Sequence, residues 1–271
     1  EMKKKIQRIE QLSNFVIGTP NSSHYFLKSK FISWHEIGQP GEKLNILGRK
    51  KGDNNSKFKI LHCPSNKDVK GTNFISRAIK NLQKKGLDFE YIEISNLSHK
   101  DALVEIENCD LLIDELFSDI VMSGIGCEAA WLNKAVIVGS YAKEELEKQI
   151  PKEIFPPVII CKPEELELTL KNLIRNNKEI KSLGSKAYKF VSNYWNKLSV
   201  ANNYNLIFNN QVPNSWWINP LEIKYIHGVG LHEEEIKQNI RTINKEFSKD
   251  ALCLSDRPDL EKRIFRLIEE A

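Results

Sequence analysis

The chain has 271 residues, a hydrophobic share of 41%, a charged share of 28% and a formal net charge of +4. This length allows one large or two modest domains, and the composition is that of an ordinary globular protein. No apolar stretch approaches the ~20 residues that span a bilayer, and no signal peptide is visible. The mild positive excess suits an anionic small ligand or contact with an acidic membrane surface, and it is too weak to indicate nucleic-acid binding.

The cysteine pattern contains neither a CxxC pair nor the spacing of a zinc site. Most of the cysteines lie in or beside apolar runs, where a free thiol behaves as a small hydrophobic group. We therefore predict a reduced cytoplasmic compartment, with the inner face of a membrane as a compatible location, and no bound metal. The cysteines are Cys63, Cys109, Cys127, Cys161 and Cys253.

The first part of the chain is predicted to contain a helix at 3–12 and a short strand at 15–18. Its opening sequence, EMKKKIQRIEQL, is typical of the middle of a helix, so we expect further sequence upstream. Residues 38–48 are typical of an interdomain connection, and residues 51–57 of a polar loop. We assign residues 1–50 to the remnant of an N-terminal domain and its linker.

From residue 51 to 208 apolar strands alternate with amphipathic helices. The predicted strands are 59–63, 89–94, 111–113, 135–138 and 158–161. The predicted helices are 72–85, one capped by Ser98, 127–132, 163–174, 178–194 and 200–208. This alternation predicts parallel βαβ units and a Rossmann-like, doubly wound α/β sheet. Ligands of such sheets bind beyond the carboxyl ends of the strands, where loops enter helices.

The first loop of that kind, residues 62–72, has the composition of a phosphate site. Lys67 and Lys70 supply positive charge, Gly71 allows close approach of the backbone, and the following helix presents unpaired N–H groups. We predict that the loop binds a diphosphate through Ser65, Asn66, Lys67, Lys70 and Gly71. A solvated lysine-bearing turn is the alternative for this loop taken alone. The order of its residues excludes a Walker loop.

The second loop lies before the predicted helix 127–132. Gly124 and Gly126 allow backbone amides to face a phosphate, and the helix start again favours an anion. Glu128 is suited to hold two neighbouring ribose hydroxyls, although a carboxylate in a first helical turn is also stabilised by the helix dipole alone. Two such loops in one sheet indicate a nucleotide diphosphate more strongly than either loop does.

Several stretches of the alternation resemble, in the same order, the C-terminal domain of GT-B glycosyltransferases of the family 4 (group 1) kind. The first is ILHCPSNKDVKGTNFISRAIKNL at 60–82, with its Lys-Gly-Thr and amphipathic helix. CDLLIDELF at 109–117 and GIGCEAAWLNKAVIVG at 124–139 are similar to the acidic strand end, glycine turn and Glu-Ala helix of that family. KPEELELTLKNLIRN at 162–176 and YKFVSNYWNKLSVANNYNLIF at 188–208 resemble its last strand–helix unit and closing helices.

The resemblance implies a nucleotide-diphosphate sugar as donor substrate, without a metal or other cofactor. Basic side chains and helix N-termini neutralise the leaving diphosphate in such enzymes, which agrees with the absence of an Asp-x-Asp motif from this sequence. It also implies that Lys70 pairs with the diphosphate, with Lys67 as a second cation, and that Glu128 holds the ribose. Gly124 and Gly126 would lie against the phosphates or the sugar. No catalytic residue is assigned.

The sequence departs from the family pattern in three places. The family usually has a second glutamate eight residues before the Glu-Ala helix, where this chain has Ile120, with Asp119 adjacent and Glu115 further back. A shift of the loop would bring Asp119 into that role. The usual proline before the next strand is Ala135. The acceptor-binding domain should come first, and only residues 1–45 could belong to it, so we do not expect this chain to catalyse transfer alone.

Residues 209–271 are predicted to form a helical tail of unknown role. The aromatic pair Trp216–Trp217 is expected to pack a long connection onto the domain, and two amphipathic helices are expected within 232–247 and 255–271.

The sequence therefore predicts a glycosyltransferase, or its donor-binding part, that moves a sugar to a glycan or lipid-linked acceptor in polysaccharide biosynthesis. Two alternatives stay open. The first is a non-catalytic, transferase-like module that assembles with a partner, and the second is a sugar-nucleotide epimerase of the same architecture.

Overall fold

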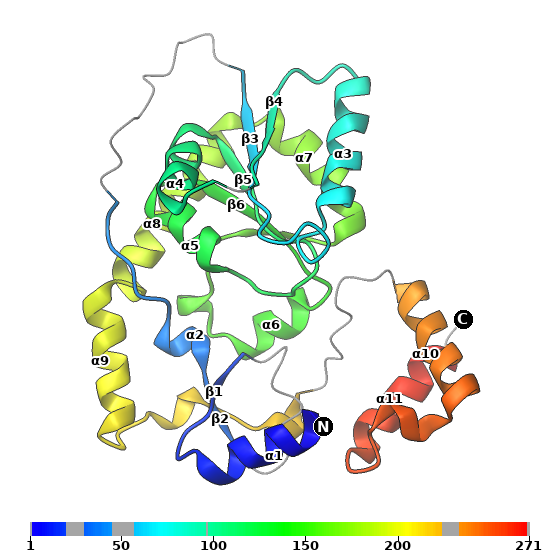
Figure 1. Ribbon diagram of the computed structural model, residues 1–271. Helices are drawn as coiled ribbons and strands as arrows, with labels where there is room; N and C mark the ends of the chain where they lie inside the picture. Colours follow the sequence, from blue (N-terminus) through cyan, green and yellow to red (C-terminus); the bar gives the residue numbers. More distant parts are fainter. Residues whose placement is uncertain (1, 20–29, 45–56, 96, 224–232, 270–271) are drawn as a thin grey trace.

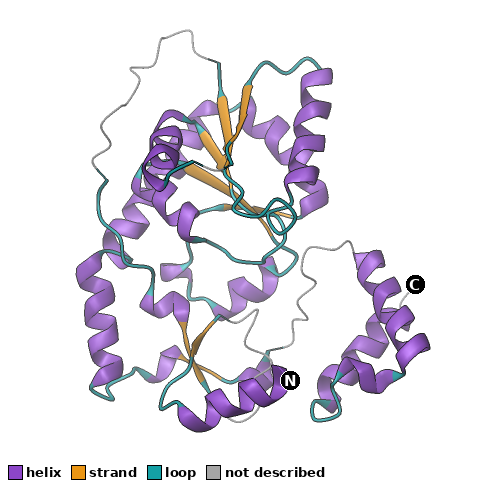
Figure 2. Ribbon diagram, in the orientation of Figure 1, coloured by secondary structure: helices purple, strands orange, loops and turns teal. Residues whose placement is uncertain are grey.

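The computed structural model describes residues 2–19, 30–44, 57–95, 97–223 and 233–269. At its centre lies a five-stranded parallel sheet with the strand order β4-β3-β5-β6-β7. The strands are β3 (Lys59–His62), β4 (Glu90–Glu93), β5 (Leu111–Ile113), β6 (Ala135–Gly139) and β7 (Ile159–Cys161). The predicted parallel, doubly wound α/β domain is confirmed, and Figure 2 shows its sheet enclosed by helices.

The central strands are apolar along their whole length because helices cover both faces of the sheet. All three residues of β5 are buried, and so are all five of β6. Ile60 and Ile113 face the side covered by α3 and α7, whereas Leu61 and Leu112 face the side covered by α4 and α5. Successive residues of each strand thus fill two separate hydrophobic cores.

The helices between residues 57 and 208 mostly follow the predicted pattern. They are α3 (Thr72–Lys84), α4 (His99–Asn108), α5 (Gly124–Trp131), α6 (Lys143–Gln149), α7 (Leu166–Ile174), α8 (Asn177–Tyr194) and α9 (Lys197–Phe208). Ser98 caps α4 as predicted, because its side chain accepts a hydrogen bond from the Asp101 amide. The helix α6 was not predicted, since its only buried residue is Leu146 and the segment shows no apolar periodicity.

A second sheet has three strands, two from the chain before the large domain and one from the chain after it. It contains β1 (Ile17–Gly18), β2 (Phe31–Ser33) and β8 (Trp217–Ile218), with β1 parallel and β8 antiparallel to β2. The helices α1 (Met2–Leu12) and α2 (Trp34–Ile37) belong to the same part of the chain. In Figure 1 this unit lies below the large sheet, on the side where the strands β3 and β5 end.

This pairing divides the chain differently from the boundaries inferred from the sequence. Those boundaries place all residues after 208 in one helical tail, whereas β8 pairs with β2. Trp216 shares a hydrophobic cluster with Val200 and Ile207 of the large domain, and Trp217 packs against the same cluster, so the expected packing of this aromatic pair is confirmed. The physical reason is that β8 is too short to be recognised by pattern and is held by its partner strand. Of the polar loop predicted at 51–57, only Lys57 belongs to the described residues.

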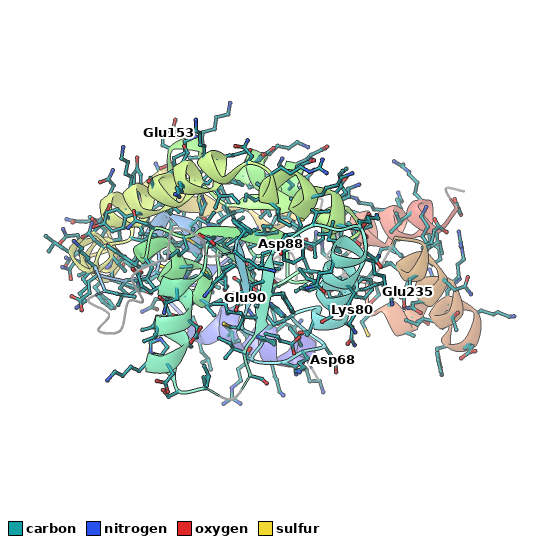
Figure 3. The ribbon with its side chains drawn as sticks, turned by 90° about the horizontal axis from the view of Figure 1, so that it is seen from above. Asp68, Lys80, Asp88, Glu90, Glu153 and Glu235 are labelled. Carbon is teal, nitrogen blue, oxygen red and sulfur yellow. The ribbon has the colours of Figure 1, made fainter. Side chains whose placement is uncertain are left out.

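The remaining helices, α10 (Glu233–Phe247) and α11 (Pro258–Glu269), confirm the two amphipathic helices expected in the tail. The Arg241 guanidinium of α10 donates hydrogen bonds to the Ile268 carbonyl of α11, which ties the pair together. Figure 1 and Figure 3 both place this pair at one side of the molecule. None of the helices in the described parts of the chain is both long and apolar enough to cross a bilayer.

Candidate functional site

The lysine-bearing turn between β3 and α3 is held in shape by its own backbone and by Asn66. The Asn66 side-chain oxygen accepts hydrogen bonds from the amides of Asp68 and Val69, at 3.0 and 3.2 Å. Gly71 adopts a left-handed φ of +72° directly before α3, a conformation that favours glycine. Asn66 therefore shapes the turn, and Ser65 is exposed on it.

Lys70 reaches from this turn to the carboxyl end of β5. Its Nζ lies 2.8 Å from Asp114 Oδ1 and 3.1 Å from Glu115 Oε2. The three side chains are largely withdrawn from water, with 12% of Lys70, 1% of Asp114 and 8% of Glu115 exposed. Burial works to lower the pKa of Lys70, but the two carboxylates outweigh it and raise that pKa above its ordinary value. Lys70 is therefore a cation held in place by two buried anions.

The glycine motif lies inside α5, because this helix begins at Gly124, three residues earlier than predicted. Ser123 is its N-cap residue, yet the Ser123 side chain accepts no capping hydrogen bond. Its hydroxyl instead donates a hydrogen bond to Asp114 Oδ2. A Cβ added at Gly126 would lie 3.3 Å from the same oxygen, so the absence of a side chain at Gly126 leaves space for the Asp114 carboxylate. Asp114 thus contacts both predicted phosphate loops.

Glu128 lies in the second turn of α5 and pairs with a residue of the neighbouring helix. Its Oε1 lies 2.7 Å from Nε2 of His99, the first residue of α4. About a third of the Glu128 side chain and most of the His99 side chain are exposed. The carboxylate is therefore accessible to a ligand, with an imidazole beside it.

Lys67 pairs with a different acid from those of Lys70. Its Nζ lies 2.6 Å from Glu93 Oε1, at the end of β4, and the ion pair is largely solvent-exposed on the lysine side. The hydrogen bond from Lys67 is the main cause of the lowered pKa of Glu93. The structure thus separates the two lysines of the turn and directs only Lys70 towards α5.

Asp119 is almost fully buried and accepts backbone hydrogen bonds. Its Oδ1 accepts from the amide of Tyr141 at 2.8 Å and from that of Ala142 at 3.4 Å. Its φ of 53° is left-handed, as aspartate tolerates. These contacts tie the loop after β5 to the turn after β6. The role of Asp119 towards a donor stays a prediction.

His62 is a buried structural residue at the end of β3. Its Nδ1 lies 2.9 Å from the Ile113 carbonyl oxygen and its Nε2 lies 3.0 Å from the Thr72 hydroxyl. Desolvation by burial is the main influence on its pKa, which is lowered. The neighbouring Cys63 thiol is also unreactive, because burial raises its pKa to about 12. Both ring nitrogens of His62 thus have partners within the protein.

The acidic part of this site was not predicted from the sequence. Asp114 was read only as the end of a strand, although an acid directly after a buried parallel strand lies at the edge where ligands bind. His99 gives only a weak signal in the sequence, because a lone histidine near a loop is more often structural or solvent-exposed, and Gln39 gives none. A Cβ on Gly124 would lie 3.5 Å from Gln39 Nε2, so the segment after α2 reaches the start of α5. In the parts of the chain that the structure describes, no group of His, Cys, Asp and Glu could hold a metal ion.

No model of a known protein family matches this sequence, and a search of curated proteins also finds no match. Solved structures do match. The Anabaena protein Alr3699/HepE in complex with UDP and glucose aligns with a TM-score of 0.52 and 12% identity over 77% of this chain. Sucrose-phosphate synthase from Thermosynechococcus elongatus aligns with a TM-score of 0.52 and 13% identity, also over 77% of the chain. The fold is that of the GT-B glycosyltransferases.

At this level of identity the similarity establishes the GT-B fold, and the five-stranded parallel sheet corresponds to one Rossmann-like half of it. The alignment spans 66% of the HepE chain and 61% of the synthase chain. The expected resemblance to GT-B proteins is thereby confirmed at the level of structure. Within the GT-B fold, the Lys70 turn and the start of α5 lie after the adjacent strands β3 and β5.

Proposed function

We propose that this chain is a glycosyltransferase, or the donor-binding part of one, and that it binds a nucleotide-diphosphate sugar. The observation that carries the proposal is the junction of the Lys70 turn with the start of α5 through Asp114. It brings a buried cation and a helix N-terminus without a serine cap to one edge of a parallel sheet. Both are groups that bind phosphate.

In this proposal Lys70 and the first-turn amides of α5 bind the diphosphate, and Glu128 binds the ribose hydroxyls. Gly124 and Gly126 lie against the phosphates or the sugar. Lys67 and Asp119 are further candidates for contact with the donor. The donor is used without a metal, because the cation and the helix start neutralise the leaving diphosphate. The acceptor is a glycan or a lipid-linked sugar, and transfer takes place in the cytoplasm or at the inner face of a membrane.

The test is calorimetric titration with nucleoside diphosphates and their sugars, namely UDP, GDP, ADP and dTDP. UDP comes first, because the HepE structures contain it. We expect saturable binding that weakens by about 10- to 100-fold for Lys70→Ala, from the ~1.5–3 kcal/mol of one charge-assisted contact. Glu128→Gln should also weaken binding, since an amide accepts ribose hydroxyl protons less strongly than a carboxylate.

The control for both variants is Lys80→Ala, an exposed lysine on α3 (Figure 3). It should leave affinity unchanged, and unfolding curves of every variant should confirm that each is folded during titration. An unaltered affinity of Lys70→Ala would remove Lys70 from the donor site.

A second candidate is a non-catalytic, transferase-like module that assembles with a partner. The observation that favours it is the acidic surroundings of Lys70, where one ammonium faces two carboxylates. Such a lysine can serve as a structural link rather than a ligand. No binding of any nucleotide in the panel would favour this candidate. Transfer of sugar to a defined acceptor would eliminate it, and formation of an epimerised sugar nucleotide without acceptor would instead indicate an epimerase.

A further inference from the structure

Asp114 occupies the position between the two loops that carry the proposed donor site. Its Oδ1 lies 2.8 Å from Lys70 Nζ, and its Oδ2 accepts a hydrogen bond from the Ser123 hydroxyl. Its own backbone amide donates to the Ile137 carbonyl at 2.9 Å, so it is fixed at the end of β5. One nearly inaccessible carboxylate therefore links the turn before α3 to the start of α5.

The contact with Lys70 orients the ammonium. A lysine ammonium has three N–H donors on a flexible stem. Asp114 and Glu115 are within hydrogen-bonding distance of two of them. The third donor is then directed by the geometry of the other two, and the rotational freedom of the side chain is already lost before a ligand arrives. Such a lysine is preorganised for one further anionic oxygen.

The contact with Ser123 affects the amides of α5. A serine at an N-cap position usually accepts a hydrogen bond from an amide of the first turn. Here the Ser123 hydroxyl donates to Asp114 and provides no such cap. The first-turn amides, which have no partner within the helix, are therefore left for a ligand. The missing Cβ of Gly126 leaves the space that Asp114 Oδ2 needs for this arrangement.

We propose that Asp114 is a positioning residue of the donor site, which holds Lys70 and turns Ser123 away from the α5 amides so that both loops bind one diphosphate. This inference rests on the proposed donor binding. It has an unusual consequence, because an anion beside an anion site should by Coulomb repulsion weaken binding. If Asp114 acts only through its charge, its neutralisation must strengthen binding. If Asp114 acts by positioning, its neutralisation must weaken binding.

The experiment compares the full chain with Asp114→Asn, Lys70→Ala and the double variant, titrated with whichever of UDP, GDP, ADP and dTDP binds the unaltered chain most tightly. We expect Asp114→Asn to weaken binding about five- to tenfold, the difference between a charge-assisted and a neutral hydrogen bond. In the Lys70→Ala background the same change should alter affinity less than about twofold, because Lys70 is gone and an asparagine oxygen can still accept the hydrogen bond from Ser123.

The matched control is Asp110→Asn. This acid lies at the opposite end of β5, where its Oδ2 accepts a hydrogen bond from the Lys59 amide at 2.8 Å. It should lower stability without changing affinity, so it separates a loss of folding from a loss of positioning. Unfolding curves of all variants show whether each is folded at the titration temperature.

Three outcomes would overturn the positioning role of Asp114. Unchanged or tighter binding by Asp114→Asn overturns the positioning role while donor binding stands. An equal loss in both backgrounds also overturns it, since Asp114 would then not act through Lys70. A chain that binds no nucleotide in the panel overturns both the positioning role and the proposed function.

Discussion

Replacing Lys70 by methionine is expected to lower the free energy of unfolding by about 3–5 kcal/mol. Methionine keeps an unbranched apolar stem of similar length and removes the charge. Asp114 and Glu115 would then be buried, 1% and 8% exposed, without the ammonium that lies 2.8 and 3.1 Å from them. Chemical denaturation with urea, analysed by linear extrapolation, measures the change.

Two further variants test whether the loss of stability comes from the two buried carboxylates. Lys67→Met removes the neighbouring lysine, whose side chain is 57% exposed in its pair with Glu93, and should change stability by at most about 1 kcal/mol. The triple variant Lys70→Met, Asp114→Asn, Glu115→Gln removes the whole charged cluster and should regain most of the lost stability. Equal effects of Lys70→Met and Lys67→Met would mean that the two carboxylates are hydrated in the folded protein.

The stabilisation by Lys70 should also be lost in alkaline solution. The pKa of Lys70 is raised in the folded state, so its contribution is complete below the unfolded lysine value and is lost as the pH rises through the folded one. The stability difference between the unaltered chain and the Lys70→Met variant should therefore narrow in strongly alkaline solution, which urea unfolding curves across that pH range would measure.

Replacing Gly184 by alanine is expected to destabilise the protein by about 1–3 kcal/mol through overpacking. This change in stability is opposite in sign to the usual one, since alanine in place of an interior helical glycine usually stabilises a protein by roughly 0.5–1 kcal/mol. Gly184 lies within α8, and a Cβ there would be 2.0 Å from the Asn133 carbonyl oxygen. This oxygen belongs to the backbone that leads into β6, so it cannot move away easily.

The matched variant is Ser185→Ala, the next residue of the same helix, which is exposed. It should be neutral or slightly stabilising, because alanine has the higher helix propensity. Urea midpoints of the two variants provide the comparison. A stabilised Gly184→Ala variant would show that α8 can move away from the Asn133 turn.

Local pattern was sufficient for most of the large domain. The strand β5 has the predicted bounds, Ser98 caps α4 as expected, and the lysine turn lies where the sequence places it. Such features depend on neighbours within a few residues, through helical or strand periodicity, capping and glycine conformation. The start of α5 was placed three residues late because Gly124 and Gly126 were read as a turn, although a helix can begin with glycines whose amides remain unpaired.

The sequence by itself determined the parallel α/β fold. It also indicated that Lys70, Gly126 and Glu128 lie at the edge of the sheet where the parallel strands end. Only the tertiary structure decided that Lys70 faces Asp114, which is 44 residues away, and that β8 pairs with β2. These contacts depend on which strands become neighbours, here β3 beside β5. Strand order follows from the packing of whole elements against both cores, and no local periodicity encodes it.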